Sequence, residues 1–504
     1  MTRTRNAGAI TFALVGFLFL LEIVSGILQG FYVPLMPDIA VHLSVTDGDL
    51  NWFEASQLLL ASIIVPIFAK LGDMYGHKRI LLISTALTAG ASWWLAFSGD
   101  FWSFLVAWSL QAFYVVWLPL EVALIFDRGR RTGTSASQTR RAAGFLVVAL
   151  EAGAIMGALG SAQILKATSG DIMLTLFAPA IAVTLVFFAI LFGVPESEPA
   201  GVRKLDGFGF VLLSIGLLLI TAGLVFLRVD DLDGMPVPLE TRLSLLAIAA
   251  ILGAAVLWVF ARWELRHPDP AIDLRVMRQP TMWPLLVTAG LFGISVLGAQ
   301  TPLATYAGTD PAIHGYGLGF DATVRSYLIG VYLVAMILGA LAFAAIAKRV
   351  SPRLSLVLAA SFVGVGYLLF LPFHLEAWQV IANMVIAGMG SGALVAALPA
   401  AAAAAAPKGQ TGVASGMTNT TKTIGGAFAS ALFGVVLVSA AADVGETVAP
   451  LAGYMTVWAV CGLGAVVSVV LLFAVPKLAF ADALPDEPAT ADPETATATA
   501  DESR

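Results

Sequence analysis

The chain has 504 residues, of which 59% are hydrophobic and 12% are charged, and its formal net charge is −6. A soluble domain carries roughly a quarter charged residues, so this composition excludes an ordinary soluble protein. Apolar stretches of about 20 residues recur from end to end, and each is long enough to cross a ~30 Å hydrocarbon layer as a helix. The stretches are continuous and do not alternate, which favours helices over a membrane β-barrel.

Several other classes of protein are also excluded. The single cysteine, Cys461, lies in the last apolar stretch, so we expect neither a disulfide framework nor a cysteine-based metal site. The five histidines do not form an HExxH pattern. We therefore expect no metal, no cofactor and no enzymatic activity, and no nucleic-acid partner for a chain of negative charge. The first apolar stretch is too long for the apolar region of a signal peptide.

The hydropathy pattern predicts an all-α membrane protein of about fourteen transmembrane helices. In chain order, the predicted spans are Ala9–Val33, Trp52–Ala69, Ile80–Phe97, Phe101–Leu124, Ala142–Leu165, Ile172–Val194, Phe208–Leu227, Leu243–Phe260, Met282–Tyr306, Val324–Ile346, Leu354–Leu371, Trp378–Ala400, Val413–Val438 and Ala449–Phe473.

The positions of lysine and arginine predict the orientation of these spans. Of the 27 lysine and arginine residues, all but five lie on the same side of the membrane as the two chain termini. Lys166, Arg228, Arg242 and Arg325 lie on the opposite side, and Lys422 lies within a span. This distribution predicts a multi-pass protein of the inner cell membrane with both termini in the cytoplasm. The last residues, 477–504, are rich in Ala, Thr, Pro, Asp and Glu and are predicted to form a disordered acidic tail.

The loop after the second predicted span has a distinctive pattern. Residues 69–79 read AKLGDMYGHKR. Asp73 can meet a helix N-terminus, where a carboxylate is favoured, and Gly76 permits a tight turn. Lys78 and Arg79 suit an anionic lipid surface. An ordinary charged turn is the alternative interpretation.

This loop resembles the G-x-L-a-D-r-x-G-r-k motif between helices 2 and 3 of the major facilitator superfamily. Ala69, Met74 and His77 depart from it. Further segments resemble the fourteen-helix drug:proton antiporter branch of that family. These are Val194-Pro195-Glu196-Ser197, residues 205–209, Glu264, His267-Pro268, residues 272–275 and residues 412–420.

The resemblance implies a domain organisation and a function. Residues 1–194 would form a six-helix half, residues 195–281 a linker with two extra helices, and residues 282–476 a second six-helix half. The loop at residues 347–353 takes the place of a second, degenerate motif. The family implies a monomeric transporter that carries a small molecule, such as a lipophilic cation, together with protons, through a cavity between the halves.

Ionisable residues inside spans are the first candidates for proton coupling, since their insertion costs at least about 2.5–3.5 kcal/mol. Glu22 lies deep in the first span, with Ser25, Gly26 and Gln29 at helical spacings after it. This stripe is expected to face substrate, because the first span lines the cavity in the family. The alternative is that Glu22 is a buried packing residue.

Glu151, in the fifth span, is a second candidate. The glycines Gly153, Gly157 and Gly160 lie on a different face of that helix, about 120–180° away at ~100° per residue. We expect the glycines to pack against another helix and Glu151 to face elsewhere. Family antiporters carry a G-x-x-x-G-P-x-x-G-G motif here, from which Ala158 departs, as do Ser161 and Ala162.

Three more acidic residues are assigned by position. Glu121 is expected at the edge of the cavity, or else as a structural partner of nearby arginines. Asp127 is expected to form a salt-bridge cluster with the loop motif. Glu54 is placed near the outer mouth of the second span, where water could reach it.

The fourth span departs most clearly from the antiporter pattern. The family carries an R-x-x-Q-G sequence, and here Gln111 matches, whereas Trp108 replaces the arginine and Ala112 the glycine. The replaced arginine would favour ionised carboxylates around it. Lys422 remains as the obvious internal cation, so any proton coupling is expected to be arranged differently.

The fourth span also concentrates aromatic residues. Trp108, Tyr114 and Trp117 are candidate substrate contacts, because aromatic faces next to carboxylates suit lipophilic cations. Membrane packing is the alternative interpretation. Gln29 and Gln111 in the first half and Gln300 in the second are candidate polar contacts.

Three functions remain after these observations. A proton-coupled exporter of lipophilic or cationic drugs or metabolites is the leading one, which would make the chain an efflux antiporter of the multidrug-resistance type. A uniporter or importer of a small metabolite is favoured by the missing arginine and proline. A membrane sensor or scaffold would not need charged residues inside its spans.

Overall fold

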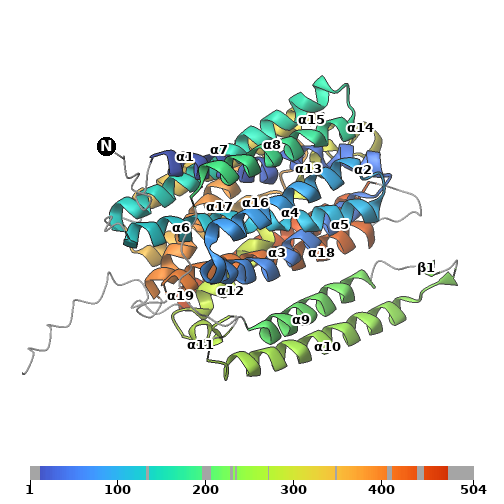
Figure 1. The fold of residues 1–504 in the computed structure, drawn as a ribbon. Coiled ribbons are helices and arrows are strands. Elements are labelled where there is room, and N and C mark those ends of the chain that lie inside the picture. Colours follow the sequence, from blue (N-terminus) through green and yellow to red (C-terminus); the bar gives the residue numbers. More distant parts are fainter. Residues whose placement is uncertain are drawn as a thin grey trace, which may run out of the picture.

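The computed structural model describes residues 12–131, 136–195, 206–226, 231–232, 235–268, 270, 272–346, 349–405, 411–439 and 448–474. Within these residues, fourteen helical segments are long and apolar enough to cross a membrane, which confirms the predicted all-α membrane fold. They run side by side in one bundle (Figure 1). A short antiparallel ladder joins β1 (Asp231–Leu232) and β2 (Met235–Pro236).

The chain crosses the bundle back and forth, so its two ends can be named. The proximal end is where α1 (Phe12–Phe31) begins and α19 (Leu451–Ala474) ends. The distal end holds α2 (Met36–Leu43), α14 (Pro311–His314) and the β ladder (Figure 1). The distribution of lysine and arginine predicts that the proximal end faces the cytoplasm.

The helices before residue 194 pack around one large cluster of buried apolar side chains and are termed the first bundle. Besides α1 and α2, its members are η1 (Val33–Leu35), α3 (Asp47–Tyr75), α4 (His77–Phe97), α5 (Phe101–Gln111), η2 (Ala112–Val116), α6 (Trp117–Arg131), α7 (Ala136–Ala167) and α8 (Ile172–Gly193).

The helices after residue 282 share a second large cluster and are termed the second bundle. Besides α14 and α19, its members are α12 (Trp283–Val296), α13 (Gln300–Gly308), α15 (Ala322–Ile346), α16 (Pro352–Leu369), α17 (Ala377–Ala405) and α18 (Thr411–Ser439).

Three predicted spans are not single helices. The first continues beyond its predicted end through η1 into α2, the fourth consists of α5, η2 and α6, and the ninth is interrupted between α12 and α13. Pro119 and Pro302 lie in the first turns of α6 and α13. Proline lacks an N–H and clashes with the carbonyl four residues earlier, so a continuous α-helix is disfavoured at both places.

The second span begins five residues before its predicted start at Trp52. Thr46 and Asp49 form a capping box, in which each side chain accepts a hydrogen bond from the backbone N–H of the other. This cap satisfies two otherwise unpaired N–H groups at the start of α3. The helix therefore starts among polar residues, which a hydropathy pattern does not include in a span.

The two inserted spans, α9 (Gly207–Val225) and α10 (Leu239–Glu264), pair with each other at one side of the molecule (Figure 1). Asp206 caps α9 at the backbone N–H of Gly209 and accepts a bond of 2.9 Å from Nε1 of Trp263. Glu264 accepts a bond from the backbone N–H of Ile272, beside α11 (Leu274–Met277). Several of the segments that resemble the fourteen-helix branch thus meet at the proximal end.

The two bundles meet along two seams. At the α3–α18 seam, Gly48 packs on the backbone of Gly434, and α9 adds Leu213 and Leu217 to a shared apolar cluster. At the α7–α15 seam, Gly330 lies against Leu159. The inserted helices therefore cover the first seam, and among the described residues they make no extensive contact with the second.

Candidate functional site

The loop motif forms the turn between α3 and α4 at the proximal end. Gly76 ends α3 and precedes α4 with φ of 103° and ψ of 132°, a conformation that residues with a Cβ atom rarely adopt. Asp73 lies 3.3 Å from Nε2 of His77, in the first turn of α4. The expectation that Asp73 lies beside a helix N-terminus agrees with this placement.

The basic residues of the motif differ in their surroundings. Nζ of Lys78 donates a hydrogen bond of 3.0 Å to the carbonyl of Leu191 at the end of α8, whereas Arg79 is exposed. Lys78 therefore joins two helices rather than extending freely toward lipid headgroups. The side chain of Asp127 lies outside the described residues, so the proposed cluster with this residue stays a prediction.

Two carboxyl groups share one site in the interior of the first bundle. Glu22 of α1 and Glu121 of α6 are both fully buried, and their side chains interact with each other. Apart from each other, neither carboxyl has a hydrogen-bond partner among the described residues. Two adjacent carboxylates repel each other, and a buried charge without a counter-charge is strongly disfavoured. The pair is therefore stable only when it holds at least one proton.

The polar stripe on α1 is divided between several environments. Glu22 and Ser25 are buried, Gln29 is exposed, and a Cβ atom on Gly26 would lie 1.9 Å from the carbonyl of Leu150. The stripe therefore does not face one common cavity, contrary to the expectation from helical spacing. The structure turns Glu22 toward α6, and Gln29 alone presents an exposed polar group.

Close packing of α1 on α7 explains this arrangement. A Cβ atom on Gly153 or Gly157 would lie within 2.6 Å of a carbonyl oxygen of α1, whereas Gly160 has open space. The glycine stripe on α7 thus packs as expected at two of its three positions. Glu151, on the other face of α7, turns away from this contact.

Glu151 meets a cation from the other bundle. It is half-buried, as is Lys422 of α18, and the two charges attract each other across the interface between the bundles. The sequence identifies each residue separately but not their pairing. An electrostatic attraction between the bundles changes when one bundle moves against the other, so it is suited to coupling charge to conformation.

Polar groups of the second bundle that are not among the candidates from the sequence lie near Glu151 and Lys422. Tyr332 of α15 interacts with Glu151, Ser391 and Tyr367, and its hydroxyl lacks a well-aligned hydrogen bond among the described residues. Tyr367 donates a bond of 2.9 Å to the carbonyl of Ser295. Tyr332, Tyr367 and Ser391 each place a hydroxyl group within an apolar span, which can be seen in the sequence. Tyrosine and serine are too common in such spans for this feature alone to identify a functional residue.

Glu54 forms another contact between the bundles, nearer the distal end. Its Oε2 accepts a hydrogen bond of 2.8 Å from the hydroxyl of Thr301 on α13, and Tyr114 lies close to the same carboxylate. Gln300 is half-buried and donates to the carbonyl of Val296 in its own span. The polar contact from the second bundle is therefore made by Thr301, the neighbour of the candidate Gln300.

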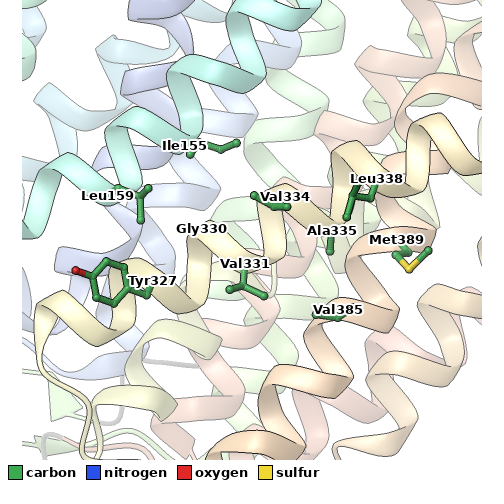
Figure 2. Close-up of a pocket in the computed structure, with 10 residues that line it drawn as sticks. All are labelled: Ile155, Leu159, Tyr327, Gly330, Val331, Val334, Ala335, Leu338, Val385 and Met389. Atoms are coloured by element: carbon green, nitrogen blue, oxygen red, sulfur yellow. The ribbon is translucent and has the colours of Figure 1, made fainter.

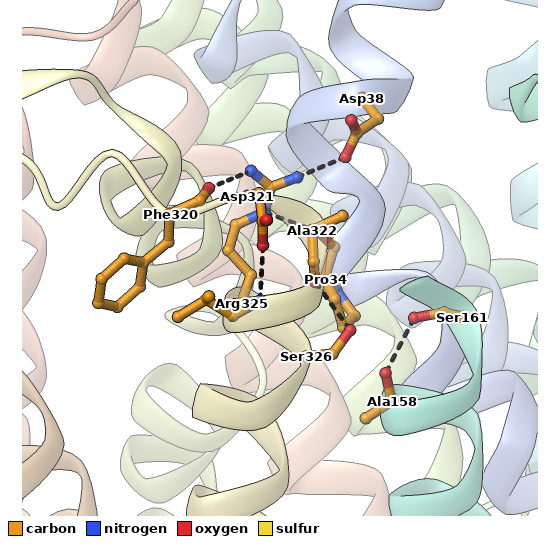
Figure 3. Close-up of polar contacts among 10 residues, drawn as sticks. Pro34, Asp38, Ala158, Ser161, Phe320, Asp321, Ala322, Arg325 and Ser326 are labelled. Carbon is orange, nitrogen blue, oxygen red and sulfur yellow. Dashed lines mark hydrogen bonds and ion pairs between the residues drawn. The ribbon is translucent and has the colours of Figure 1, made fainter. Parts of the chain in front are cut away.

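The distal end is closed by polar contacts between the bundles. The guanidinium of Arg325 on α15 binds the carboxylate of Asp38 and donates to the carbonyl of Pro34 at 2.9 Å (Figure 3). Asp47 accepts a bond of 3.2 Å from the backbone N–H of Ala449 and one of 3.0 Å from the hydroxyl of Tyr454. Together these contacts fix α2 and the start of α3 to the second bundle.

The aromatic residues of the fourth span lie inside the first bundle. Trp108 is 4% exposed, and its ring centroid lies 4.8 Å from that of Tyr32 and 5.8 Å from that of Phe104. Trp117 is fully buried and Tyr114 is 7% exposed. The expected wall of aromatic faces toward substrate is therefore absent at these positions in this conformation, because the rings pack against other helices of the same bundle.

Gln111 is also held within the first bundle. Its Nε2 donates to the hydroxyl of Tyr32 at 2.7 Å and to Oγ of Ser92 at 2.9 Å, and the residue is 1% exposed. These bonds connect α4 and α5 with Tyr32, the residue that follows α1. A substrate could reach the amide only after these bonds break, so its role as a substrate contact stays a prediction. No cluster of three possible metal ligands occurs among the described residues.

Comparisons with known proteins agree with this architecture. The model of the Major Facilitator Superfamily matches residues 18–430. The multidrug efflux pump LfrA of Mycolicibacterium smegmatis is 24% identical over 448 residues, which cover 86% of this chain and 82% of that protein. The methyl viologen resistance protein SmvA of Salmonella typhimurium is 24% identical over 411 residues, which cover 80% of this chain and 77% of that protein.

A solved structure shows the same fold. A mutant form of the nucleoside transporter NupG superimposes with a TM-score of 0.64 at 13% sequence identity. The match covers 92% of this chain and 99% of that one. At this level of identity the likeness concerns the arrangement of the helices alone.

Proposed function

Because the chain belongs to the Major Facilitator Superfamily and is therefore a multi-pass membrane transporter, we propose that it exports lipophilic or cationic small molecules in exchange for protons. Its proximal end would face the cytoplasm. Substrate would bind between the bundles, and a rocking motion of one bundle against the other would alternate access to the two sides of the membrane.

The carboxyl pair Glu22–Glu121 carries the proposal. It is buried, it has no cation among its interacting groups, and at least one proton is needed to keep it stable. Movement that admits water to this pair would stabilise the ionised form and release a proton. Return to the buried arrangement would require a proton again, which is what a proton-coupled cycle needs.

The charges between the bundles provide a second part of the proposed transport mechanism. Glu151 and Lys422 attract each other across the interface in the present conformation. A cationic substrate that approached Glu151 would compete with Lys422 for the same carboxylate. Binding of substrate could in this way loosen a contact between the bundles and favour the motion that carries it across.

The closed distal end fits a conformation open toward the cytoplasm, the side from which an exporter takes up its substrate. Arg325–Asp38 and Tyr454–Asp47 join the bundles at that end. The relatives LfrA, named as a multidrug efflux pump, and SmvA, named as a methyl viologen resistance protein, support drugs and cations as the class of substrate.

Transport in proteoliposomes tests the proposal, with the fluorescent lipophilic cation ethidium as the probe. Proteoliposomes would carry a pH gradient that is acidic inside, which corresponds to the outside of a cell. We expect ethidium to accumulate inside above the external concentration and to leave when a protonophore is added. Equilibration to equal concentrations, with no effect of the pH gradient, would overturn proton coupling and favour the uniporter.

A further inference from the structure

A pocket of about 450 Å³ opens on the α7–α15 seam, the seam that the inserted helices do not cover. It lies between α7, α15 and α17 (Figure 2). Its lining comprises Ile155, Leu159, Tyr327, Gly330, Val331, Val334, Ala335, Leu338, Val385 and Met389. Apart from the hydroxyl of Tyr327 and the thioether of Met389, the lining side chains are hydrocarbon.

The pocket is open toward the surface that a membrane would surround. Val334 is 45% exposed and Leu338 is 55% exposed, and both belong to a predicted membrane span. Val385 and Met389, on the far wall, are only partly accessible. A molecule from the bilayer could therefore enter at Val334 and reach Met389 without passing through water.

The length of the pocket fits one chain from one leaflet. Tyr327 and Leu338 mark its ends along α15, and at 1.5 Å per residue they lie about 16 Å apart. This length is close to half the thickness of a ~30 Å hydrocarbon layer, which is the depth of one leaflet. Tyr327 is five residues from the distal start of α15, at a depth where tyrosine side chains favour the membrane interface.

Neither water nor a void is a good occupant. A buried water needs two to four polar partners, and the deep part of this pocket offers none beyond the weakly accepting sulfur of Met389. An empty space would leave the lining atoms without dispersion contacts on one side. A hydrocarbon chain satisfies those contacts and requires no hydrogen bonds.

Two walls of the pocket are held together rigidly, whereas the third belongs to the other bundle. A Cβ atom on Gly339 or Gly392 would lie within 2.0 Å of a backbone oxygen of the facing helix, so α15 and α17 are in direct backbone contact. Ile155 and Leu159 belong to α7. A change in the angle between the bundles would therefore change the width of the pocket.

We propose that this pocket binds one acyl chain of a glycerophospholipid from the leaflet at the distal end, and that the chain fills the α7–α15 seam while the distal contacts are closed. The site takes lipid as a ligand and not as a transported substrate. The proposed lipid site is inferred from the pocket and from its position within the membrane spans. It does not depend on proton coupling or on the direction of transport.

Photolabelling of the full-length protein in lipid vesicles tests this site. The probe is a phosphatidylcholine with a photoreactive diazirine near the end of one acyl chain, diluted into palmitoyl-oleoyl phosphatidylcholine. After irradiation, labelled residues are identified by mass spectrometry. We expect label on Met389 and Val385, which are half-buried, in addition to label on residues exposed at the surface of the spans.

A variant that occupies the entrance provides the comparison. Val334→Trp places a larger apolar side chain at an exposed position, where overpacking of the core is avoided, and should abolish label on Met389. Leu185→Trp is the matched control, because Leu185 of α8 is 65% exposed and lies outside the pocket. It should leave label on Met389 unchanged.

Two results would overturn the site. Label confined to exposed residues, with none on Met389 or Val385, would show that no chain enters the pocket. Displacement of the label from Met389 by ethidium, at the concentrations at which ethidium is transported, would assign the pocket to substrate instead. Because the first result is obtained without a transport assay, failure of the lipid site is distinguishable from failure of proton coupling.

Discussion

The carboxyl groups of Glu22 and Glu121 face each other inside the first bundle, and no cation is among the groups that interact with either. Glu22 comes from α1 and Glu121 from α6, and both are fully buried. The two residues therefore share one electrostatic environment and are expected to act as one proton-binding unit rather than as two separate sites.

Replacement of either member should abolish proton coupling. Glu22→Gln and Glu121→Gln each keep the shape of the side chain but remove the group that shares the proton. We expect both variants to reach the membrane at normal levels and to lose ethidium accumulation driven by a pH gradient in proteoliposomes. The double variant should be no worse than either single one, since residues that act as a unit are not additive.

Glu376→Gln is the matched control for this series, because Glu376 is exposed at the distal start of α17. It should transport like the unmodified protein. If Glu22→Gln still accumulates ethidium with the same pH dependence, Glu22 is structural and the coupling role passes to Glu151.

The pair Glu151–Lys422 should show energetic coupling between the bundles. Glu151→Gln or Lys422→Gln alone leaves a half-buried charge without its partner, whereas the double variant leaves two neutral groups. We expect each single variant to lower the melting temperature in detergent and the double variant to recover part of the loss. The coupling should exceed about 0.5 kcal/mol, which is the scatter for sites that do not interact.

Lys166→Gln serves as the control for loss of a lysine charge, since Lys166 is exposed at the distal end of α7. It should leave the melting temperature unchanged. Strictly additive effects of Glu151→Gln and Lys422→Gln would contradict an attraction between the two charges.

The spans and the loop motif can be predicted well from the sequence because both are local. Continuous apolar stretches define membrane helices wherever they pack, and Gly76 is required by the backbone conformation of its own turn. The interruption at Pro302 is also readable in principle, since proline disrupts a helix by itself. The hydropathy pattern misses it because the apolar character of the ninth span continues across the break.

The partners of the buried charges cannot be predicted from spacing along one helix. Helical spacing assigns Glu22 to a substrate-facing stripe, yet packing of α1 on α7 at Gly26 turns it toward α6. Trp108 is expected to face substrate, but Phe104 and Tyr32 enclose it. Helical periodicity tells which residues share a face, whereas only the packing of all the helices decides what that face meets.

Gly76→Ala should destabilise the proximal turn. Gly76 has φ of 103°, where a Cβ atom strains the backbone by about 1–3 kcal/mol. We expect a lower melting temperature in detergent and reduced transport. Gly90→Ala is the control from α4, the helix that follows the turn: a Cβ atom there meets nothing within 4 Å, and alanine favours the helix. A melting temperature for Gly76→Ala equal to that of Gly90→Ala would contradict the strain.

Arg325→Ala should shift the protein toward a conformation that is open at the distal end. Arg325 is 5% exposed and connects α15 to Asp38 and the carbonyl of Pro34 in the first bundle. Its loss leaves these acceptors without their donor in the closed state, at a cost of about 1–3 kcal/mol. Since each 1.4 kcal/mol is tenfold in an equilibrium, the ratio of open to closed protein should rise by about fivefold to about a hundredfold.

Distances between spin labels at the distal end measure this shift. Val41 of α2 and Ile313 of α14 belong to different bundles and are 80% and 75% exposed, so Val41→Cys and Ile313→Cys can be labelled in a Cys461→Ser background. In pulsed electron paramagnetic resonance, Arg325→Ala should increase the share of long distances. Exchange of the two charges, Asp38→Arg with Arg325→Asp, should restore part of the short-distance population if the ion pair itself closes the distal end. An unchanged distance distribution in Arg325→Ala would show that Asp47 and Tyr454 suffice for closure.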